Sequence, residues 1–147
     1  MIRRLSFLAA LVLIFAFAAA PVQAANKVVV MPAGSSVGPY SPAIAVGDLI
    51  FTSGQIPMNP ATKSMPEGIE AQTRQAIANV KAVLEAGGSS LDKAVKITIF
   101  LKDLNDYNTV NKIYSEYFPN GFPARTCVQV ARIPLDALIE IEAVGVK

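Results

Sequence analysis

The sequence contains no histidine and only one cysteine, Cys127, in its 147 residues. A single cysteine cannot form a disulfide within the chain. The absence of histidine excludes Ser-His-Asp and Cys-His catalytic arrangements and the usual zinc ligand sets. Any chemistry must therefore depend on carboxylate, hydroxyl, amide, lysine or arginine groups.

A surplus of basic charge is also missing. The 13 lysines and arginines exceed the 11 acidic residues by only two, and two of the basic residues, Arg3 and Arg4, lie at the extreme N-terminus. Beyond them the basic side chains are scattered among acidic ones instead of gathering in a stripe. Nucleic-acid binding, which depends on a basic surface, is therefore not expected.

The first 24 residues have the three-part layout of a secretory signal peptide. Arg3 and Arg4 precede an apolar run over residues 7–20, and small side chains lie near the end at Ala24. We expect cleavage after Ala24 and a mature protein that is periplasmic or secreted, without stable membrane association. An uncleaved anchor is the alternative, but it needs ~20 apolar residues, and Pro21 and the shorter run weigh against it. The arginine pair leaves twin-arginine export open beside the general Sec route.

Residues 25–147 contain no repeat or linker and are expected to form a single domain. Short β-branched runs alternate there with two segments of helical periodicity. The predicted strands span residues 27–31, 43–46, 49–53, 94–101, 124–130 and 138–146, and the predicted helices span residues 66–85 and 105–118. The order βββαβαββ predicts an α+β fold with a mainly β sheet, two helices on one face and the other face uncovered.

Alternation along the last two predicted strands indicates where polar groups project. One side of the strand over 124–130 holds Thr126, Val128 and Val130, and the other holds Arg125, Cys127 and Gln129. If the apolar sides cover the helices, Arg125, Glu140 and Glu142 project together from the helix-free face of neighbouring strands. Such groups need partners, and contacts between copies of the chain would turn this face into polar clefts.

Within such a cleft the planar guanidinium of Arg125 suits a carboxylate ligand, and Glu140 would orient a water molecule. The alternative, which spacing alone favours, is that Arg125 and a glutamate simply pair with each other across the sheet. The enzymatic interpretation depends on residues 125 and 140 meeting in one pocket; a structure with their side chains on opposite sides of the sheet, or with no cavity beside them, would contradict it.

Four further residues have a structural explanation beside a functional one. Ser53 precedes Gly54, which marks either a β-bulge or a close approach by a ligand or another backbone. Tyr40 follows a Gly-Pro turn, where packing explains an aromatic residue as well as ligand contact does. Asn111 falls inside a predicted helix, where solvent exposure would explain an amide. Cys127 is more typical of a small buried side chain than of a nucleophile, because no histidine can activate it.

Five short motifs occur in a fixed order along the chain. They are Gly38-Pro39-Tyr40-Ser41, Thr52-Ser53-Gly54-Gln55-Ile56-Pro57, Thr109-Val110-Asn111 with Tyr114, Pro123-Ala124-Arg125 with Cys127-Val128, and Ile139-Glu140-Ile141-Glu142-Ala143. Each motif alone is weak, but five in this order are specific. Together they resemble the Rid family, also called the YjgF family, from about residue 26 to residue 147.

The resemblance implies a chorismate-mutase-like (YjgF-like) fold and a homotrimer with three clefts at its subunit interfaces. It also implies hydrolysis of reactive enamines and imines, such as 2-aminoacrylate, to 2-keto acids and ammonia, with no cofactor and no metal. Carried over residue by residue, Arg125 would hold the substrate carboxylate and Glu140 would position the attacking water. The cleft would be lined by Tyr40, Ser53, Asn111 and the backbone of Cys127, which would contribute a hydrogen bond near the imine.

Some positions depart from the family pattern. Pro42 stands where many relatives have glutamine, Thr126 where serine is common, and Gln129 where an acidic residue is common, and the loop over 118–122 looks short. None of these removes a site group, although the loop affects the shape of the cleft. Export separates the chain from the cytoplasmic enzymes expected to make aminoacrylate, which leaves its substrate open.

Two other functions compete with the enzymatic one. A non-catalytic trimer would use the same cleft to bind small carboxylates such as 2-keto acids, and ammonia release from an imine would distinguish the two. A holdase-like surface protein has no support from the near-neutral charge beyond the N-terminus or from any long exposed apolar segment.

Overall fold

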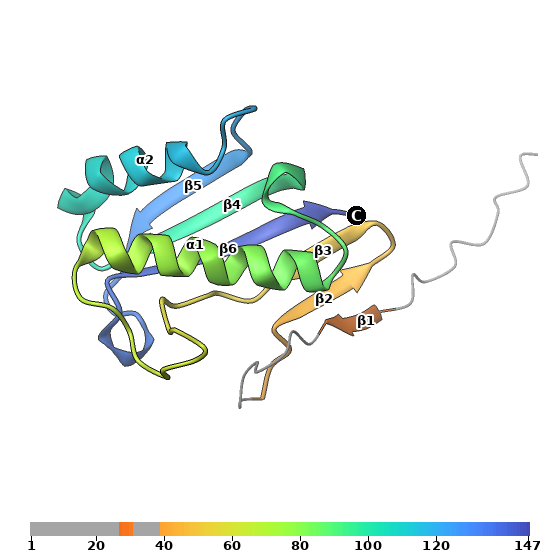
Figure 1. Cartoon of the computed structure of the whole chain (residues 1–147), viewed down its shortest axis with the longest axis horizontal. Helices are drawn as coiled ribbons and strands as arrows, with labels where there is room; N and C mark the ends of the chain where they lie inside the picture. The colour runs from red at the N-terminus through yellow and green to blue at the C-terminus, as the bar shows by residue number, and fades with distance from the viewer. Residues whose placement is uncertain (1–26, 31–38) are drawn as a thin grey trace, which may run out of the picture.

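The computed structural model describes residues 27–30 and 39–147, so the predicted signal peptide lies outside the described residues. Six strands and two α-helices follow one another in the expected order (Figure 1). The strands are β1 (Lys27–Val30), β2 (Ala43–Val46), β3 (Leu49–Thr52), β4 (Ala94–Leu101), β5 (Ala124–Gln129) and β6 (Ile139–Val146), and the helices are α1 (Ile69–Ala86) and α2 (Tyr107–Glu116). The predicted α+β class and element order are confirmed.

The sheet has the strand order β1-β2-β3-β6-β4-β5. All neighbours are antiparallel except β4 and β5, which run parallel because α2 forms the crossover between them. This crossover places β5 at the free edge of the sheet, with β4 between β5 and β6. The expectation that the last two strands are neighbours is therefore wrong.

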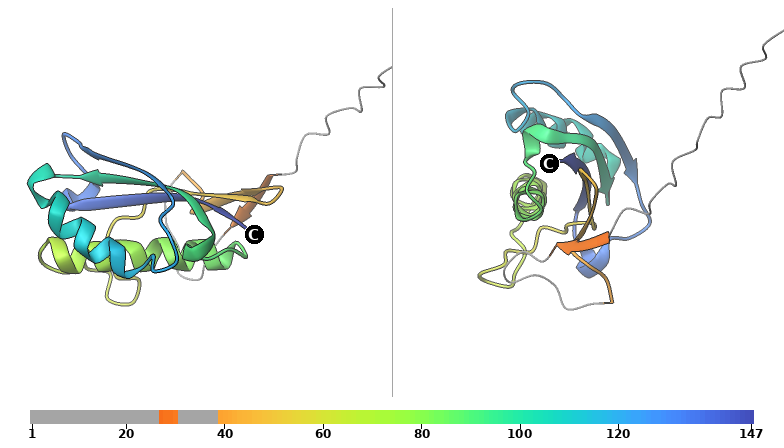
Figure 2. Two further views of the ribbon diagram at one scale, coloured as in Figure 1. Left: turned by 90° about the horizontal axis from the view of Figure 1, so that it is seen from above. Right: turned by 90° about the vertical axis from the view of Figure 1, so that its right-hand side faces the viewer.

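Both helices lie on the same face of the sheet, as predicted (Figure 2). The core between the layers contains Ala76, Val80 and Leu84 of α1 and the inward side chains of the central strands, Ile50, Ile97, Ile99, Leu101, Ile139 and Ile141. Helix α1 begins at Ile69, three residues later than predicted, because Gly68 has φ 79° and cannot continue a right-handed helix.

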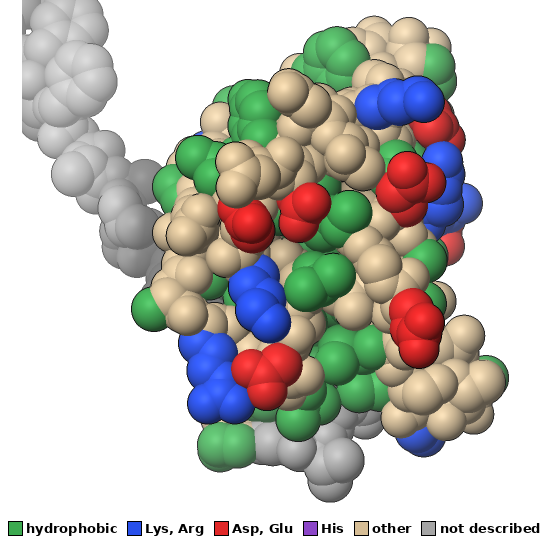
Figure 3. Space-filling model, turned by 90° about the vertical axis from the view of Figure 1, so that its left-hand side faces the viewer, with side chains coloured by type: hydrophobic (Ala, Val, Ile, Leu, Met, Phe, Trp, Pro, Cys, Tyr) green, Lys and Arg blue, Asp and Glu red, His purple; other side chains and the backbone are tan. Residues whose placement is uncertain are grey.

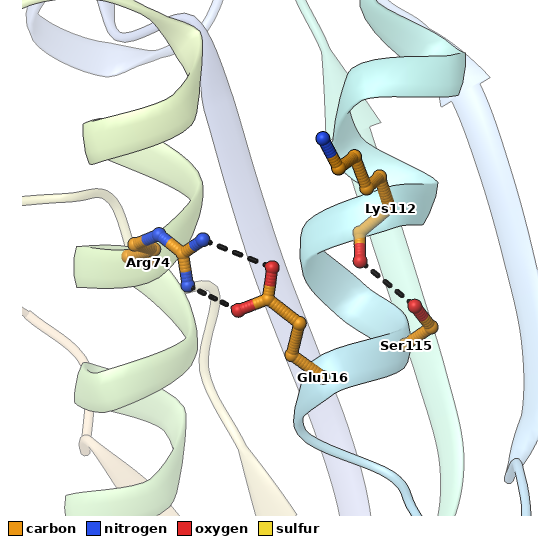
Figure 4. A network of polar contacts seen from close by, with 4 residues as sticks. All are labelled: Arg74, Lys112, Ser115 and Glu116. Atoms are coloured by element: carbon orange, nitrogen blue, oxygen red, sulfur yellow. Dashed lines mark hydrogen bonds and ion pairs between the residues drawn. The ribbon is translucent and has the colours of Figure 1, made fainter.

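An exposed ion pair connects the two helices. The Arg74 guanidinium on α1 donates hydrogen bonds of 2.6 and 3.0 Å to the two carboxylate oxygens of Glu116 on α2 (Figure 4). A bidentate pair of this kind fixes orientation more than it adds stability. It helps to set the position of α2 over the sheet edge formed by β5.

The helix-free face of the sheet carries apolar and polar side chains. Phe51 on β3 is 44% exposed and Val128 on β5 is 40% exposed, and Val144 lies opposite Phe51 on the same face. Glu142 and Thr98, which pair with each other on β6 and β4, lie on this face between Phe51 and Val128. One end of the molecule shows basic and acidic side chains interleaved with no continuous basic area (Figure 3). None of the helices in the described ranges has the length and apolar character needed to cross a membrane.

Candidate functional site

Arg125 lies on β5, where it contacts α2. Its Nη2 donates hydrogen bonds to Oδ1 of Asn111 at 2.7 Å and to the hydroxyl of Tyr107 at 3.3 Å. The guanidinium carbon also lies 4.8 Å from the ring centre of Tyr114 and 5.6 Å from that of Tyr107, within cation–π distance of both rings. The structure therefore brings together two predicted site residues, Arg125 and Asn111.

Sequence reasoning missed the role of Tyr107 and undervalued Tyr114. The two tyrosines lie four residues before and three residues after Asn111 on α2, so all three share one helix face. That spacing was visible in the sequence. What it did not indicate was that this face lies over Arg125.

The predicted placement of Arg125 on the helix-free face is wrong. Arg125 pairs with Ile97 of β4, and Ile97 is fully buried under the helices, so Arg125 projects from the helix-bearing face. Glu140 pairs with Phe100, which belongs to the other alternating set of β4 and lies on the helix-free face. Within one chain the guanidinium and the carboxylate thus lie on opposite sides of the sheet, and a site formed by both in a single protomer is excluded.

A simple ion pair does not explain Arg125 either. Among the residues the structure describes, the ion pairs join Arg74 to Glu116, Lys81 to Glu85 and Arg132 to Asp136. No carboxylate from the described part of the chain thus lies within 4 Å of the Arg125 guanidinium. The guanidinium is held by neutral partners and keeps its charge available for an anion.

A cavity of about 320 Å³ opens beside this guanidinium. It is lined by Asn111, Tyr114, Ser115, Phe122, Pro123 and Arg125. The rings of Tyr114 and Phe122 stack with their centres 6.2 Å apart. Burial raises the pKa of Tyr114 to about 12, against the opposing effect of Arg125, so its hydroxyl stays neutral.

Cys127 lies on the same side of β5 as Arg125 and packs against the core. Burial raises the pKa of its thiol, with Arg125 acting in the opposite direction, so the thiol form is favoured over the nucleophilic thiolate. The backbone N–H of Val130 donates to the Leu101 carbonyl of β4. Because peptide groups alternate along a strand, the backbone groups of Arg125 and Cys127 point the other way, toward the open sheet edge.

Glu140 lies on β6, two residues from Glu142 on the same face. Burial raises the pKa of Glu140, and the negative charge of Glu142 adds to the effect. A carboxyl group with a raised pKa is a better proton acceptor once it ionises.

Ser53 and Gly54 form a β-bulge beside Glu140. Phe51 pairs with Val144 and Gln55 with Ile141, so three residues of one strand face two of the other. The bulge explanation of Gly54 holds, but what approaches the residue is a side chain and not a ligand or another backbone, because a Cβ at this position would lie 1.8 Å from Oε1 of Glu140. The residue must be glycine for the carboxylate to occupy its place.

A hydrogen bond connects Ser53 of this bulge to the segment that contains Tyr40. The hydroxyl of Ser53 donates a 2.7 Å hydrogen bond to the carbonyl of Ser41, which directly follows Tyr40. Tyr40 itself is 58% exposed, so its ring is not explained by packing within the described chain. We call Glu140, Ser53 and Tyr40 the glutamate half-site, and Arg125, Asn111 and Cys127 the arginine half-site.

Each of the three residues that depart from the family pattern accepts a local hydrogen bond. The Thr126 hydroxyl accepts a hydrogen bond of 2.6 Å from Nζ of Lys96. Oε1 of Gln129 accepts one of 2.9 Å from the backbone N–H of Leu104, as a carboxylate oxygen would. The carbonyl of Pro42 accepts one of 2.8 Å from the backbone N–H of Ser53. Within the described ranges, no group of three acidic or cysteine side chains is arranged to hold a metal ion.

Sequence relatives carry names that bear on this site. The chain is 49% identical over 118 residues to the 2-iminobutanoate/2-iminopropanoate deaminase of Escherichia coli, covering 78% of this chain and 92% of the relative. It is 52% identical over 112 residues to a RutC family protein of Pyrococcus abyssi, covering 76% and 88% of the two chains.

Solved structures with the same fold indicate the same family. The YjgF gene product of Escherichia coli matches with a TM-score of 0.74 at 49% identity, over 76% of this chain and 91% of that one. Escherichia coli TdcF, solved with bound serine, matches with a TM-score of 0.74 at 43% identity, over 76% and 91%. The family model described as Endoribonuclease L-PSP matches residues 31–147. The chain therefore belongs to the Endoribonuclease L-PSP family, the family of YjgF and RutC proteins.

Proposed function

We propose that the protein hydrolyses reactive enamines and imines of the 2-aminoacrylate type to 2-keto acids and ammonia. The observation that carries this proposal is Arg125, which neutral partners hold at the mouth of a cavity with no carboxylate to neutralise it. A fixed guanidinium of this kind suits a 2-imino acid, whose carboxylate is adjacent to the reacting carbon. The deaminase name of the Escherichia coli relative supports the same reaction.

The active unit in this proposal is a homotrimer. The arginine and glutamate half-sites lie on opposite faces of the sheet, so a complete site needs Arg125 from one copy and Glu140 from the next. Such a head-to-tail contact generates a closed ring when the rotation between copies allows it. Exposed apolar side chains on the helix-free face, such as Phe51 and Val128, favour such a contact.

Water addition to the imine needs a proton acceptor and an electrophilic carbon. Arg125 holds the substrate carboxylate, and the carboxylate of Glu140 accepts a proton from water as the water oxygen bonds to the imine carbon; the C=N electron pair passes to the nitrogen, which takes up a proton. In the resulting carbinolamine the nitrogen takes up the proton that Glu140 received, the C–N bond breaks to release ammonia, and the hydroxyl loses its proton to Glu140 as the keto group forms. An enamine enters the same sequence after a proton adds to its terminal carbon.

The even charge of the chain supports a small-molecule substrate over a nucleic acid. Eleven basic residues beyond Arg4 face eleven acidic ones, and they do not form a continuous basic area at the end of the molecule seen in Figure 3. Ribonuclease chemistry would also have to proceed without histidine. A cavity beside a fixed guanidinium suits an imine or keto acid that carries a carboxylate.

Replacing the guanidinium tests the proposal directly. We expect Arg125→Ala to lower ammonia release from freshly generated 2-aminoacrylate by at least about 100-fold, because the substrate anchor is lost while the core is untouched. Arg132→Ala is the matched control, since Arg132 is an exposed arginine paired with Asp136 away from the cavity. Near-normal ammonia release by the Arg125 variant, with an unchanged mass in light scattering, would rule out the proposed mechanism.

A second function uses the same cleft without turnover. The structure of TdcF with bound serine is an example of a relative that holds a small amino acid, and Arg125 would hold the carboxylate of a 2-keto acid in the same way. Calorimetric binding of 2-keto acids, without ammonia release from any imine, would favour this binding function.

We further propose that residues 1–24 are removed during export, so that the mature chain works in the periplasm or outside the cell. The basic start, the apolar run and the small residues before Ala25 support this. Mass spectrometry of the secreted protein should find Ala25 at its N-terminus. Finding Met1 retained in a membrane fraction would contradict the proposal.

A further inference from the structure

The cavity beside Arg125 has walls that the hydrolysis of a three-carbon imine does not use. Its apolar surface is formed by the stacked rings of Tyr114 and Phe122 together with Pro123, and its polar groups lie at one side around Arg125 and Asn111. Phe122 is 68% exposed, which is unusual for an aromatic side chain. An aromatic wall left open next to a cation is suited to a ligand that carries both an anion and an apolar group.

The position of Arg125 decides how such a ligand would lie. Asn111 and Tyr107 both accept hydrogen bonds from Nη2, and two tyrosine rings flank the guanidinium, so its plane is fixed. In a 2-imino acid the carbon that bears the carboxylate also bears the side chain. Once the carboxylate is bound at Arg125, the side chain therefore begins only two bonds from the carboxylate carbon and lies in the cavity that Tyr114, Phe122 and Pro123 line.

The size of the cavity exceeds what a small substrate fills. A volume of about 320 Å³ falls in the range of roughly 300–1,000 Å³ that is usual for sites of drug-sized ligands. A methyl or ethyl side chain would leave the exposed ring of Phe122 in contact with water, whereas Tyr114 is already buried. A branched or aromatic side chain would cover the Phe122 ring, and apolar burial favours the larger ligand.

We propose that this cavity selects 2-imino acids, and the 2-keto acids they yield, that have bulky apolar side chains, with Phe122 as the specificity-determining residue. This inference rests on the proposed function for the reaction, but the selection concerns binding and can be measured without turnover. The substrates would be imines of branched-chain or aromatic amino acids, supplied by a reaction that oxidises the amine of such amino acids.

The experiment compares ligands that differ only in side chain. Calorimetry would measure the binding of pyruvate, 4-methyl-2-oxopentanoate and phenylpyruvate to the full-length mature protein. An amino-acid oxidase would generate the matching imines for an ammonia-release assay. We expect the two larger keto acids to bind at least about tenfold more tightly than pyruvate, and kcat/KM for their imines to follow the same order.

Phe122→Ala tests the role of the aromatic wall. We expect it to remove about tenfold or more of the preference, so that the affinities for the three keto acids converge. Leu135→Ala is the matched control, because Leu135 is 66% exposed and does not line the cavity. Light scattering would verify that each variant keeps the mass of the parent.

The possible outcomes separate this inference from the proposed function. Equal binding of the three keto acids, tighter binding of pyruvate, or an equal loss for all ligands in the Phe122 variant would overturn the inference alone. Graded binding without ammonia release from any imine would support the inference and overturn the enzymatic proposal.

Discussion

Gly54→Ala tests the contact between the bulge and Glu140. A Cβ at position 54 would lie 1.8 Å from Oε1, 2.7 Å from Cδ and 3.1 Å from Cγ of Glu140. Ordinary contact begins at 3.4 Å, so the carboxylate must move by about 1.6 Å. It can do so because the clashing atoms belong to the far end of a flexible side chain. The backbone at Gly54 has no positive φ, so alanine itself is tolerated.

The expected result is an active-site defect without a folding defect. A misplacement of about 1 Å can cost about 100-fold in rate, so we expect kcat for imine hydrolysis to fall by about 100-fold or more. Binding of a 2-keto acid should change much less than kcat, because Arg125 holds the ligand carboxylate and is itself unaltered. The free energy of unfolding should stay within about 1 kcal/mol of the parent value. Ammonia release, calorimetry and thermal denaturation measure the three quantities.

A double variant decides whether the effect passes through Glu140. If Gly54→Ala acts only by displacing the carboxylate, it should add nothing to the loss caused by Glu140→Gln, so the two changes should be strongly non-additive. Activity of Gly54→Ala within about threefold of the parent would refute the reasoning. Additive losses would show that Gly54 acts by some other route.

Two further predictions concern titratable groups near the half-sites. Tyr114→Phe should leave stability unchanged or raise the free energy of unfolding by up to about 1 kcal/mol in thermal denaturation, because the Tyr114 hydroxyl is buried without a partner among the described residues. A clear loss of stability would mean that the hydroxyl has a partner in the assembly. Glu142→Gln should move the acid limb of the pH–rate profile to lower pH, because burial and then Glu142 raise the pKa of Glu140, and water activation requires its ionised form. An acid limb that does not move in the Glu142 variant would contradict this assignment. The raised pKa also means that the folded chain holds the Glu140 proton more tightly than the unfolded chain does. Stability therefore falls as pH rises from the ordinary glutamate pKa through the raised value.

Most of the fold could be predicted from local pattern. The β2–β3 hairpin forms at Gly47-Asp48 with Val46 opposite Leu49, as the turn pair indicated. Helical periodicity placed Thr73, Ala76 and Val80 on the buried face of α1, where they lie. These features depend on neighbours in sequence, which is why alternation and turn residues were sufficient.

The side of β5 that faces the helices could not be predicted in this way. Because Val128 is apolar, its side of β5 was expected to face the helices. Val128 is instead 40% exposed on the helix-free face, whereas Cys127 on the other side packs against the core. Alternation separates two sides of a strand without saying which one is covered. The rule that apolar side chains face the helices therefore fails on β5.

The five motifs contain the residues of both half-sites, but they could not show that the two half-sites lie on opposite faces of the sheet. Asn111 and Arg125 meet because the crossover through α2 brings positions fourteen residues apart together at the sheet edge. Gly54 and Glu140 meet because β3 and β6 are neighbours, although they are far apart in the chain. Both pairings depend on strand order, which no local pattern encodes.

The placement of Arg125 and Glu140 on opposite faces has a consequence for assemblies that mix two variants. Two defective proteins, one lacking the guanidinium and one lacking the carboxylate, should complement each other when they are unfolded together and allowed to reassemble. In a ring where each catalytic pair spans two neighbours, random mixing of equal amounts leaves about a quarter of the pairs intact. Activity recovered by mixing two inactive variants would show that each active site contains residues from two polypeptides.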